Sequence, residues 1–192
     1  WEKDFIPLLN GKDLSGWKSL LKGGGEDNGS VFTIRDETLT ISGKPHGYIY
    51  TEASYRNYLI RLDWRYERPK GLVNDREFLG DSGLLMHITG EPKVWPDSVQ
   101  VQWYHQEYGL TYLVPHIQNK NYIWNAAAVQ KAMHRVGEWN RTEVLSKNGQ
   151  ITCTLNGIEV CVGDGKLLEG RIGLQSEGAM VHFKRIDIKL LP

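Results

Sequence analysis

Several segments of the chain carry side chains that could act as acids, bases or hydrogen-bonding groups of fixed geometry. Asp63 and Arg65 alternate with apolar residues in YLIRLDWRY, and Gln100 and Gln102 alternate with valine in SVQVQW. Glu177 lies in the turn segment QSEGA. Carboxylates can accept or deliver protons, whereas guanidinium and amide groups hold a polar molecule in one orientation. These residue types indicate a site for a polar ligand such as a sugar.

The elements that must position these groups are strands, in which successive side chains point to opposite faces. Arg61, Asp63 and Arg65 share one side of their segment, and His87 shares a side with Leu85 in DSGLLMHI. A solvated sheet face is the alternative for any one of them. Solvated faces usually carry Lys, Glu and Thr, so Arg, Asp, His and Gln favour a binding face. Its expected aromatic edge is formed by Trp95, Trp103, Tyr104 and Tyr112.

The spacing of strand-like runs predicts the fold class. Runs rich in β-branched and aromatic residues recur between turn residues at intervals of roughly 8–12 residues, as in all-β sandwiches and barrels. The stretch NAAAVQKAMHRV at 125–136 fits either a short helix or a long loop. No internal repeat or linker interrupts the pattern, and we expect one domain over residues 1–192.

Two Asn-Gly pairs, at 148–149 and 156–157, predict type I′ hairpin turns. A two-residue turn at 156–157 would place Cys153 opposite Val160, with apolar partners along one side. Cys161 would then face the other way, so we expect no disulfide between the two cysteines.

The last strand-like segment changes phase along its length. Val181 and Phe183 alternate as inward residues, after which Ile186 and Ile188 do so. One extra residue near Lys184-Arg185 predicts a β-bulge.

Composition excludes some classes of protein and leaves others open. The formal net charge is zero, which disfavours a nucleic-acid binder, and no apolar run approaches the length of a membrane span. Seven Trp and nine Tyr outnumber four Phe. This bias suits stacking on sugars, and it also suits an ordinary aromatic-rich β protein. The six histidines show no zinc-binding spacing.

Six segments, in order along the chain, form a recognisable set: LLNGKDLSGW at 8–17, YRNYLIRLDWRY at 55–66, DSGLLMHI at 81–88, VWPDSVQVQ at 94–102, GEWNRTEVLSKNGQITCTLNG at 137–157 and GRIGLQSEGAMVHFKRIDIKLL at 170–191. Together they resemble the 3-keto-disaccharide hydrolase family, and the resemblance runs from residue 5 to residue 191.

The resemblance implies a concanavalin A-like jelly-roll β-sandwich of two antiparallel sheets, with the site on its concave face. It also implies an exported bacterial protein, periplasmic or extracellular, with a carbohydrate ligand. The chain begins at Trp1 without a signal peptide, so we expect a mature form. Members of known activity act on 3-keto-glycosides. There the ketone acidifies the C2 proton, a base removes that proton, and the C1 substituent leaves. A divalent metal ion could polarise the ketone.

Matched position by position, the resemblance and the polar face nominate two sets of residues. The catalytic candidates are Glu177, His87, Asp63 and Arg65. The substrate-binding candidates are Gln100, Gln102, Gln175, Trp103, Tyr112 and His105. Gln100 stands where the family usually has Glu, and an amide cannot act as a base. His87 stands where Arg is common, and Lys184-Arg185 replaces the usual Arg-Asn.

Three functional hypotheses follow. The leading one is an exported β-sandwich that cleaves a glycoside or keto-sugar by elimination or hydrolysis. The alternatives are a non-catalytic carbohydrate-binding module and a structural or adhesion sandwich without a sugar site. The enzyme requires a pocket enclosing a carboxylate or His, and the binding module requires a shallow groove with exposed Trp or Tyr. The structural protein requires neither.

Overall fold

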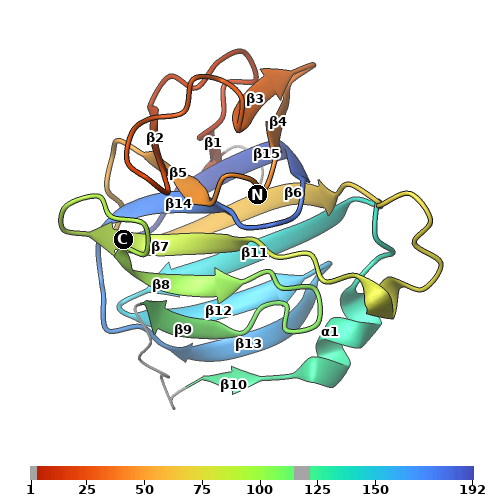
Figure 1. The fold of residues 1–192 in the computed structure, drawn as a ribbon. Helices are drawn as coiled ribbons and strands as arrows, with labels where there is room; N and C mark the ends of the chain where they lie inside the picture. Colours follow the sequence, from red (N-terminus) through yellow and green to blue (C-terminus); the bar gives the residue numbers. More distant parts are fainter. Residues whose placement is uncertain (1–3, 115–121) are drawn as a thin grey trace.

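The computed structural model describes residues 4–114 and 122–192, which form two antiparallel β-sheets packed face to face (Figure 1). The six-stranded sheet has the order β2 (Trp17–Leu21), β5 (Gly47–Thr51), β14 (Arg171–Ser176), β7 (Gly83–Thr89), β8 (Asp97–Gln102) and β9 (Thr111–Val114). The nine-stranded sheet has the order β10 (Ile123–Trp124), β13 (Ile158–Asp164), β12 (Gln150–Leu155), β11 (Asn140–Lys147), β6 (Tyr58–Tyr66), β15 (Val181–Leu190), β4 (Thr38–Ile41) and β3 (Phe32–Arg35), with β1 (Ile6–Pro7) paired to β15. This arrangement confirms the predicted all-β sandwich.

Two short helices lie outside the sheets, α1 (Ala126–Ala132) and the 3-10 helix η2 (Asp75–Glu77). The side chain of Asn125 caps α1 by accepting the backbone N–H of Ala128 at 3.0 Å. Of the two possibilities for 125–136, the short helix is therefore the observed one. None of the described helices has the length and apolar character that crossing a bilayer requires.

Aromatic stacking between the sheets forms the centre of the core. The ring of Trp64 stacks on Trp103 at 5.0 Å and on Tyr108 at 5.2 Å between centroids, and its Nε1 donates to Thr142 Oγ1 at 2.8 Å. Trp103 is fully buried and also stacks on Phe183. Its prediction as a substrate-binding residue is therefore wrong, because it faces the same side of β8 as the core valines.

Both Asn-Gly turns form as predicted, with Asn148 and Asn156 in the left-handed region at φ 51° and 48°. The register beyond the second turn was predicted wrongly. β13 contains an extra residue that shifts the pairing, so Cys153 lies directly opposite Cys161. Both cysteines are buried on the core side as free thiols. The structure therefore has no disulfide between them, but the reason given from the sequence does not hold.

The bulge predicted near Lys184-Arg185 is confirmed. In the pairing of β15 with β6, Phe183 lies opposite Trp64 and Arg185 lies opposite Asp63, so Lys184 is the extra residue. The bulge keeps apolar side chains inward on both sides of the irregularity.

Candidate functional site

A hollow of about 320 Å³ opens on the outer face of the six-stranded sheet, the face turned away from the core. This volume is in the range of small-molecule sites. The hollow is lined by Trp95, Gln100, Gln102, Tyr112, Val114 and Glu177. Five of these six belong to the polar and aromatic residues singled out from the sequence, and they come from β8, β9 and the segments next to β8 and β14.

A row of three amides forms the floor of the site. Gln100 Nε2 donates to Gln102 Oε1 at 3.1 Å, and Gln175 Nε2 donates to Gln100 Oε1 at 3.3 Å. Gly83 on β7 lies between the strands that carry them, paired with Gln102. A Cβ at Gly83 would lie 2.0 Å from Gln175 Oε1 and 3.1 Å from Gln100 Nε2. The amides can therefore meet only because residue 83 has no side chain.

This row explains the unusual residue at position 100. Gln100 is buried, and it both donates to Gln102 and accepts from Gln175. A glutamate could accept from Gln175 but could not donate to Gln102. The neutral amide is therefore the residue that satisfies both neighbours. The Oε1 atom of Gln175 is buried and has no hydrogen-bond partner among the described residues, which leaves an acceptor for a ligand hydroxyl or a water.

At this end of the sheet the charge of one carboxyl group, that of Asp81, acts on another, that of Glu177. Burial, and secondly the charge of Asp81, raises the pKa of Glu177 to about 8. Burial also raises the pKa of Asp81 to about 6. A hydrogen bond from the Ser82 backbone opposes this shift, and the charge of Glu107 adds to it. Two acids with separated pKa values are typical of acid–base sites, since one can stay protonated while the other is ionised.

Aromatic groups complete the walls. Burial raises the pKa of Tyr112, and the charges of Glu177, Asp81 and Glu107 raise it further. The hydroxyl of Tyr112 therefore stays protonated and can donate a hydrogen bond. Trp95 is 43% exposed at the rim, where its ring is available for stacking. Beside the hollow the same face is apolar, because Tyr48, Tyr50, Leu85 and Ile88 form a small buried cluster with Leu20. The predicted polar face with an aromatic edge therefore covers only part of this side of the sheet.

His87 does not belong to this site. The pairing of β7 with β8 shifts after Met86, and His87 takes the left-handed conformation with φ 53°. This irregularity turns the side chain inward, where Nε2 lies 2.8 Å from Ser146 Oγ of the opposite sheet and the ring lies 5.5 Å from that of Tyr58. The prediction that His87 shares the outer face with Leu85 is wrong, because the strand is not regular at this point.

The buried imidazole makes stability depend on pH. Burial lowers the pKa of His87 from 6.5 to about 4, so the unfolded chain takes up a proton at a higher pH than the folded protein does. The free energy of unfolding should therefore fall by about 3 kcal/mol through this group as the pH drops through that window. We expect His87→Asn, which tolerates the left-handed backbone, to lose this dependence.

The measurement is urea unfolding of the wild type and His87→Asn at several pH values between 7 and 4. Glu177 and Asp81 act in the opposite direction over part of this range, since their raised pKa values favour the folded state at lower pH. The difference between the two proteins isolates His87. A difference that does not change with pH would show that folding does not lower the pKa of His87.

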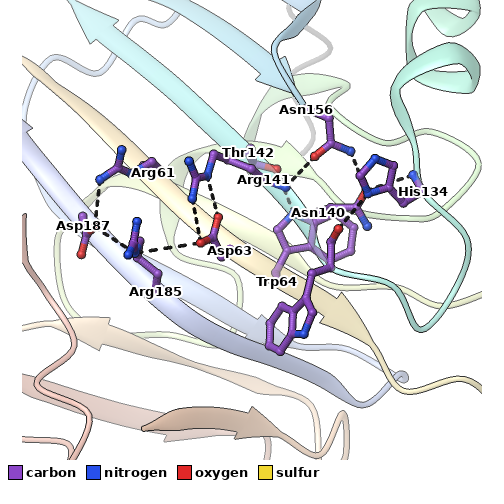
Figure 2. A network of polar contacts seen from close by, with 11 residues as sticks. Arg61, Asp63, Trp64, His134, Asn140, Arg141, Thr142, Asn156, Arg185 and Asp187 are labelled. Carbon is purple, nitrogen blue, oxygen red and sulfur yellow. Dashed lines mark hydrogen bonds and ion pairs between the residues drawn. The ribbon is translucent and has the colours of Figure 1, made fainter. Parts of the chain in front are cut away.

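Asp63 and Arg65 lie on the other sheet. They belong to β6, and their side chains point outward from the nine-stranded sheet. Asp63 is held by Arg141 through Nε at 2.7 Å and Nη2 at 3.0 Å, with Arg185 at 3.9 Å. Figure 2 shows Asp63 between these two arginines and Asp187 between Arg61 and Arg185. This is an ion-pair network on the face opposite the hollow.

The surroundings of both residues account for their types without catalysis. Burial raises the pKa of Asp63, but the hydrogen bonds and charge of Arg141 and the charge of Arg185 outweigh it, and the pKa is lowered. The carboxylate is therefore an ionised counter-ion. Arg65 lies over the ring of Trp139, with 5.2 Å from its guanidinium carbon to the ring centroid. The prediction that both residues join Gln100 at one face is wrong.

His105 lies in a different cleft, together with Asp75 and His134, and its ring packs edge-on against Phe78. Of the predicted residues, the structure brings together Glu177, Tyr112 and the three glutamines, and it separates the remaining five. Asp81 was missed by the sequence analysis. The signal was an acid directly before the strand that carries Gly83, at the strand end nearest Glu177.

A metal ion was expected to be a possible electrophile. The described residues contain no group of three or more His, Cys, Asp or Glu side chains arranged to hold a metal. Asp81 and Glu177 supply only two such ligands, so the residues around the hollow do not form a typical metal site.

Comparison with known families identifies the chain. Residues 4–189 match the model of the 3-keto-alpha-glucoside-1,2-lyase-like domain. The chain belongs to this family. The family resemblance seen in the sequence motifs is thereby confirmed. No curated protein matches the chain.

Solved structures share the fold of this family member. A candidate glycosyl hydrolase of Parabacteroides distasonis ATCC 8503 aligns with a TM-score of 0.73 at 22% identity, over 100% of this chain and 95% of that chain. The carbohydrate-binding module CBM66 of Bacillus subtilis aligns with a TM-score of 0.59 at 14% identity, over 91% of this chain and 95% of that chain. A Bacillus subtilis protein with a galectin-like fold aligns with a TM-score of 0.65 at 10% identity, over 96% of this chain and 94% of that chain. The family connects the chain with carbohydrates, and the three solved structures show that its fold is shared.

Proposed function

We propose that the protein cleaves 3-keto-glycosides at the hollow on the six-stranded sheet, by elimination at C1 and C2 followed by addition of water. The observation that carries this proposal is the pair of carboxyl groups, Asp81 and Glu177, whose pKa values are raised to about 6 and about 8. At pH 7 Asp81 is mainly ionised and Glu177 is mainly protonated. The site can therefore offer a base and an acid at the same time.

The roles follow from the protonation states. The ionised Asp81 takes the C2 proton, and the electron pair of that bond forms an enolate with the C3 ketone. The C1–O bond then breaks, and its electron pair leaves with the glycosidic oxygen, which receives the proton of Glu177. Addition of water across the resulting double bond completes a net hydrolysis.

The neighbouring groups support this chemistry. Tyr112 stays protonated and can donate a hydrogen bond to the C3 oxygen, where negative charge develops. The buried, unpartnered Gln175 Oε1 can accept from a sugar hydroxyl, and the partly exposed Trp95 can stack on a sugar ring. The acidic residues and the absence of a lining cation among the described residues favour an uncharged sugar in this hollow.

A non-catalytic carbohydrate-binding module remains the alternative. The observation that favours it is Gln100, which removes a carboxylate that the family usually has at the floor of the site. The fold likeness to a carbohydrate-binding module is consistent with it. In either case the ligand is a carbohydrate. We further propose that the protein is exported, periplasmic or extracellular, since glycans are processed there.

The test is incubation of the protein with 3-keto-glucosides and with their non-oxidised parents, with detection of released sugar, in EDTA and with added divalent metals. We expect turnover of the keto compounds. Asp63→Asn is the matched control, since Asp63 lies on the opposite face, and this variant should retain wild-type turnover per folded molecule. Binding without turnover under all conditions would replace the enzyme by the binding module. Absence of both binding and turnover would refute a sugar site.

A further inference from the structure

A cleft of about 750 Å³ in the described part of the chain is separate from the hollow. It lies at the end of the sandwich where α1 sits beside the yellow segment that contains η2 (Figure 1). The loop between β8 and β9 closes its third side through His105 and Gln106. The proposed reaction uses none of these residues, so the cleft has no assigned role.

The charges around this cleft are unbalanced. Arg76 and Arg135 line it, and neither guanidinium makes a hydrogen bond or an ion pair with the described residues. The carboxylate of Asp75 also lines it, but Asp75 accepts Arg68 Nη1 at 2.8 Å and the backbone N–H of Val136 at 2.8 Å. The positive charge of the two unpaired arginines therefore remains available to a ligand.

The other polar groups can donate to or accept from a ligand. Glu138 accepts the backbone N–H of Arg135 at 3.1 Å, so that contact leaves the guanidinium unengaged. His134 Nδ1 donates to the carbonyl of Trp139 at 2.8 Å, because a carbonyl can only accept, and this leaves Nε2 for other contacts. The amide of Gln130 on α1 adds a further donor. Two guanidinium groups with neutral donors nearby are a common arrangement around oxyanions.

We propose that this cleft binds the anionic group of an acidic glycan, which would be the carboxylate of a uronic acid or a sulfate ester. The loop between β8 and β9 connects it with the hollow, because His105 and Gln106 line the cleft while the charge of the next residue, Glu107, acts on Asp81. The glycan part of this inference rests on the proposed function, whereas the binding of an anion does not.

The experiment is calorimetric titration of the full chain with glucuronate, glucose 6-sulfate, glucose and inorganic sulfate. We expect glucuronate or glucose 6-sulfate to bind, and the one that binds identifies the anion. The double variant Arg76→Gln/Arg135→Gln should weaken that binding at least tenfold. Arg35→Gln, an exposed arginine on β3, is the matched control and should bind as the wild type does. The Arg76→Lys/Arg135→Lys variant, which keeps the charge, should retain part of the affinity.

Three outcomes would overturn the inference or part of it. Failure of both anionic sugars to bind would exclude the site. The site would also be excluded if the double variant unfolds at the normal temperature and still binds the anionic sugar with the wild-type affinity. Equal affinity for sulfate and for the sulfated sugar would exclude the glycan part. Glu177→Gln should bind the anionic sugar as the wild type does. A loss of turnover with intact anion binding therefore separates the fate of the proposed reaction from the fate of this site.

Discussion

Glu177→Gln is expected to lower kcat/KM on a 3-keto-glycoside by about 10³-fold, which is a usual effect of removing a general acid. Glutamine occupies nearly the same volume and can still hydrogen-bond, but it has no proton to deliver to the leaving oxygen. The wild type should show a bell-shaped pH profile with apparent limbs near pH 6 and pH 8, set by Asp81 and Glu177 respectively. The residual activity of the variant should lack the alkaline limb.

The same substitution should increase stability at alkaline pH. The pKa of Glu177 is raised to about 8 in the folded protein from 4.5, so the folded state loses stability as the pH rises through that interval. Glutamine carries no charge at any pH. After allowance for the partial exposure of this side chain, the variant should be more stable than the wild type by about 1–2 kcal/mol at pH 8.5 and about equal at pH 4.

The two effects are measured by initial rates from pH 5 to pH 9 and by urea unfolding at the same pH values. Glu169→Gln, which removes an exposed carboxylate between β13 and β14, serves as the control and should change neither quantity. Unchanged turnover in Glu177→Gln would place the general acid elsewhere. Lost turnover without the alkaline gain in stability would show that Glu177 is ionised at neutral pH and has another role.

Gly83→Ala is expected to abolish the amide floor of the site. The new Cβ would lie 2.0 Å from Gln175 Oε1, so this buried amide must move away from Gln100. We expect a loss of about 1–3 kcal/mol in the free energy of unfolding from overpacking, and sugar binding weakened at least tenfold. Urea unfolding and titration with the keto-glycoside measure the two quantities.

A double-mutant cycle tests the cause. In Gly83→Ala/Gln175→Ala the clashing amide is gone, so the loss of stability should be smaller than the sum of the two single losses by about 1 kcal/mol or more. Additive losses would indicate that alanine at position 83 acts through the strand backbone instead. Retained sugar affinity in the single variant would show that the amide row does not contact the ligand.

Local patterns in the sequence predicted those features that depend on neighbouring residues. The Asn-Gly turns and the bulge at Lys184 follow from conformational preferences over a few residues, and both are present. For residues 125–136 the sequence left a short helix and a long loop open, and the structure has the helix. The sequence also predicted which residues of β8 share a face, since period-2 alternation places Gln100 and Gln102 together on one side of the strand. Six ordered motifs identified the family, because they extend over nearly the whole chain.

Irregularities within strands limited these predictions. A single extra residue in β13 places Cys161 opposite Cys153 on the same face, where the sequence predicted opposite faces. A shift after Met86 turns His87 from the outer face into the core. One inserted residue exchanges the two faces for every later position in a strand. Neither irregularity follows from the local composition, since no turn residue or proline marks the position of the extra residue in either strand.

The sequence by itself therefore determined the fold class, the family and the side of the strand on which Gln100 and Gln102 lie. Only the tertiary structure decided which strands share a sheet. It placed Asp63 among arginines on the nine-stranded sheet, and it brought Glu177, Asp81 and the amide row together on the six-stranded one. The physical reason is that alternation along a strand is a local property. Sheet membership and the burial that raises the pKa of a carboxyl group depend on residues far away in the chain.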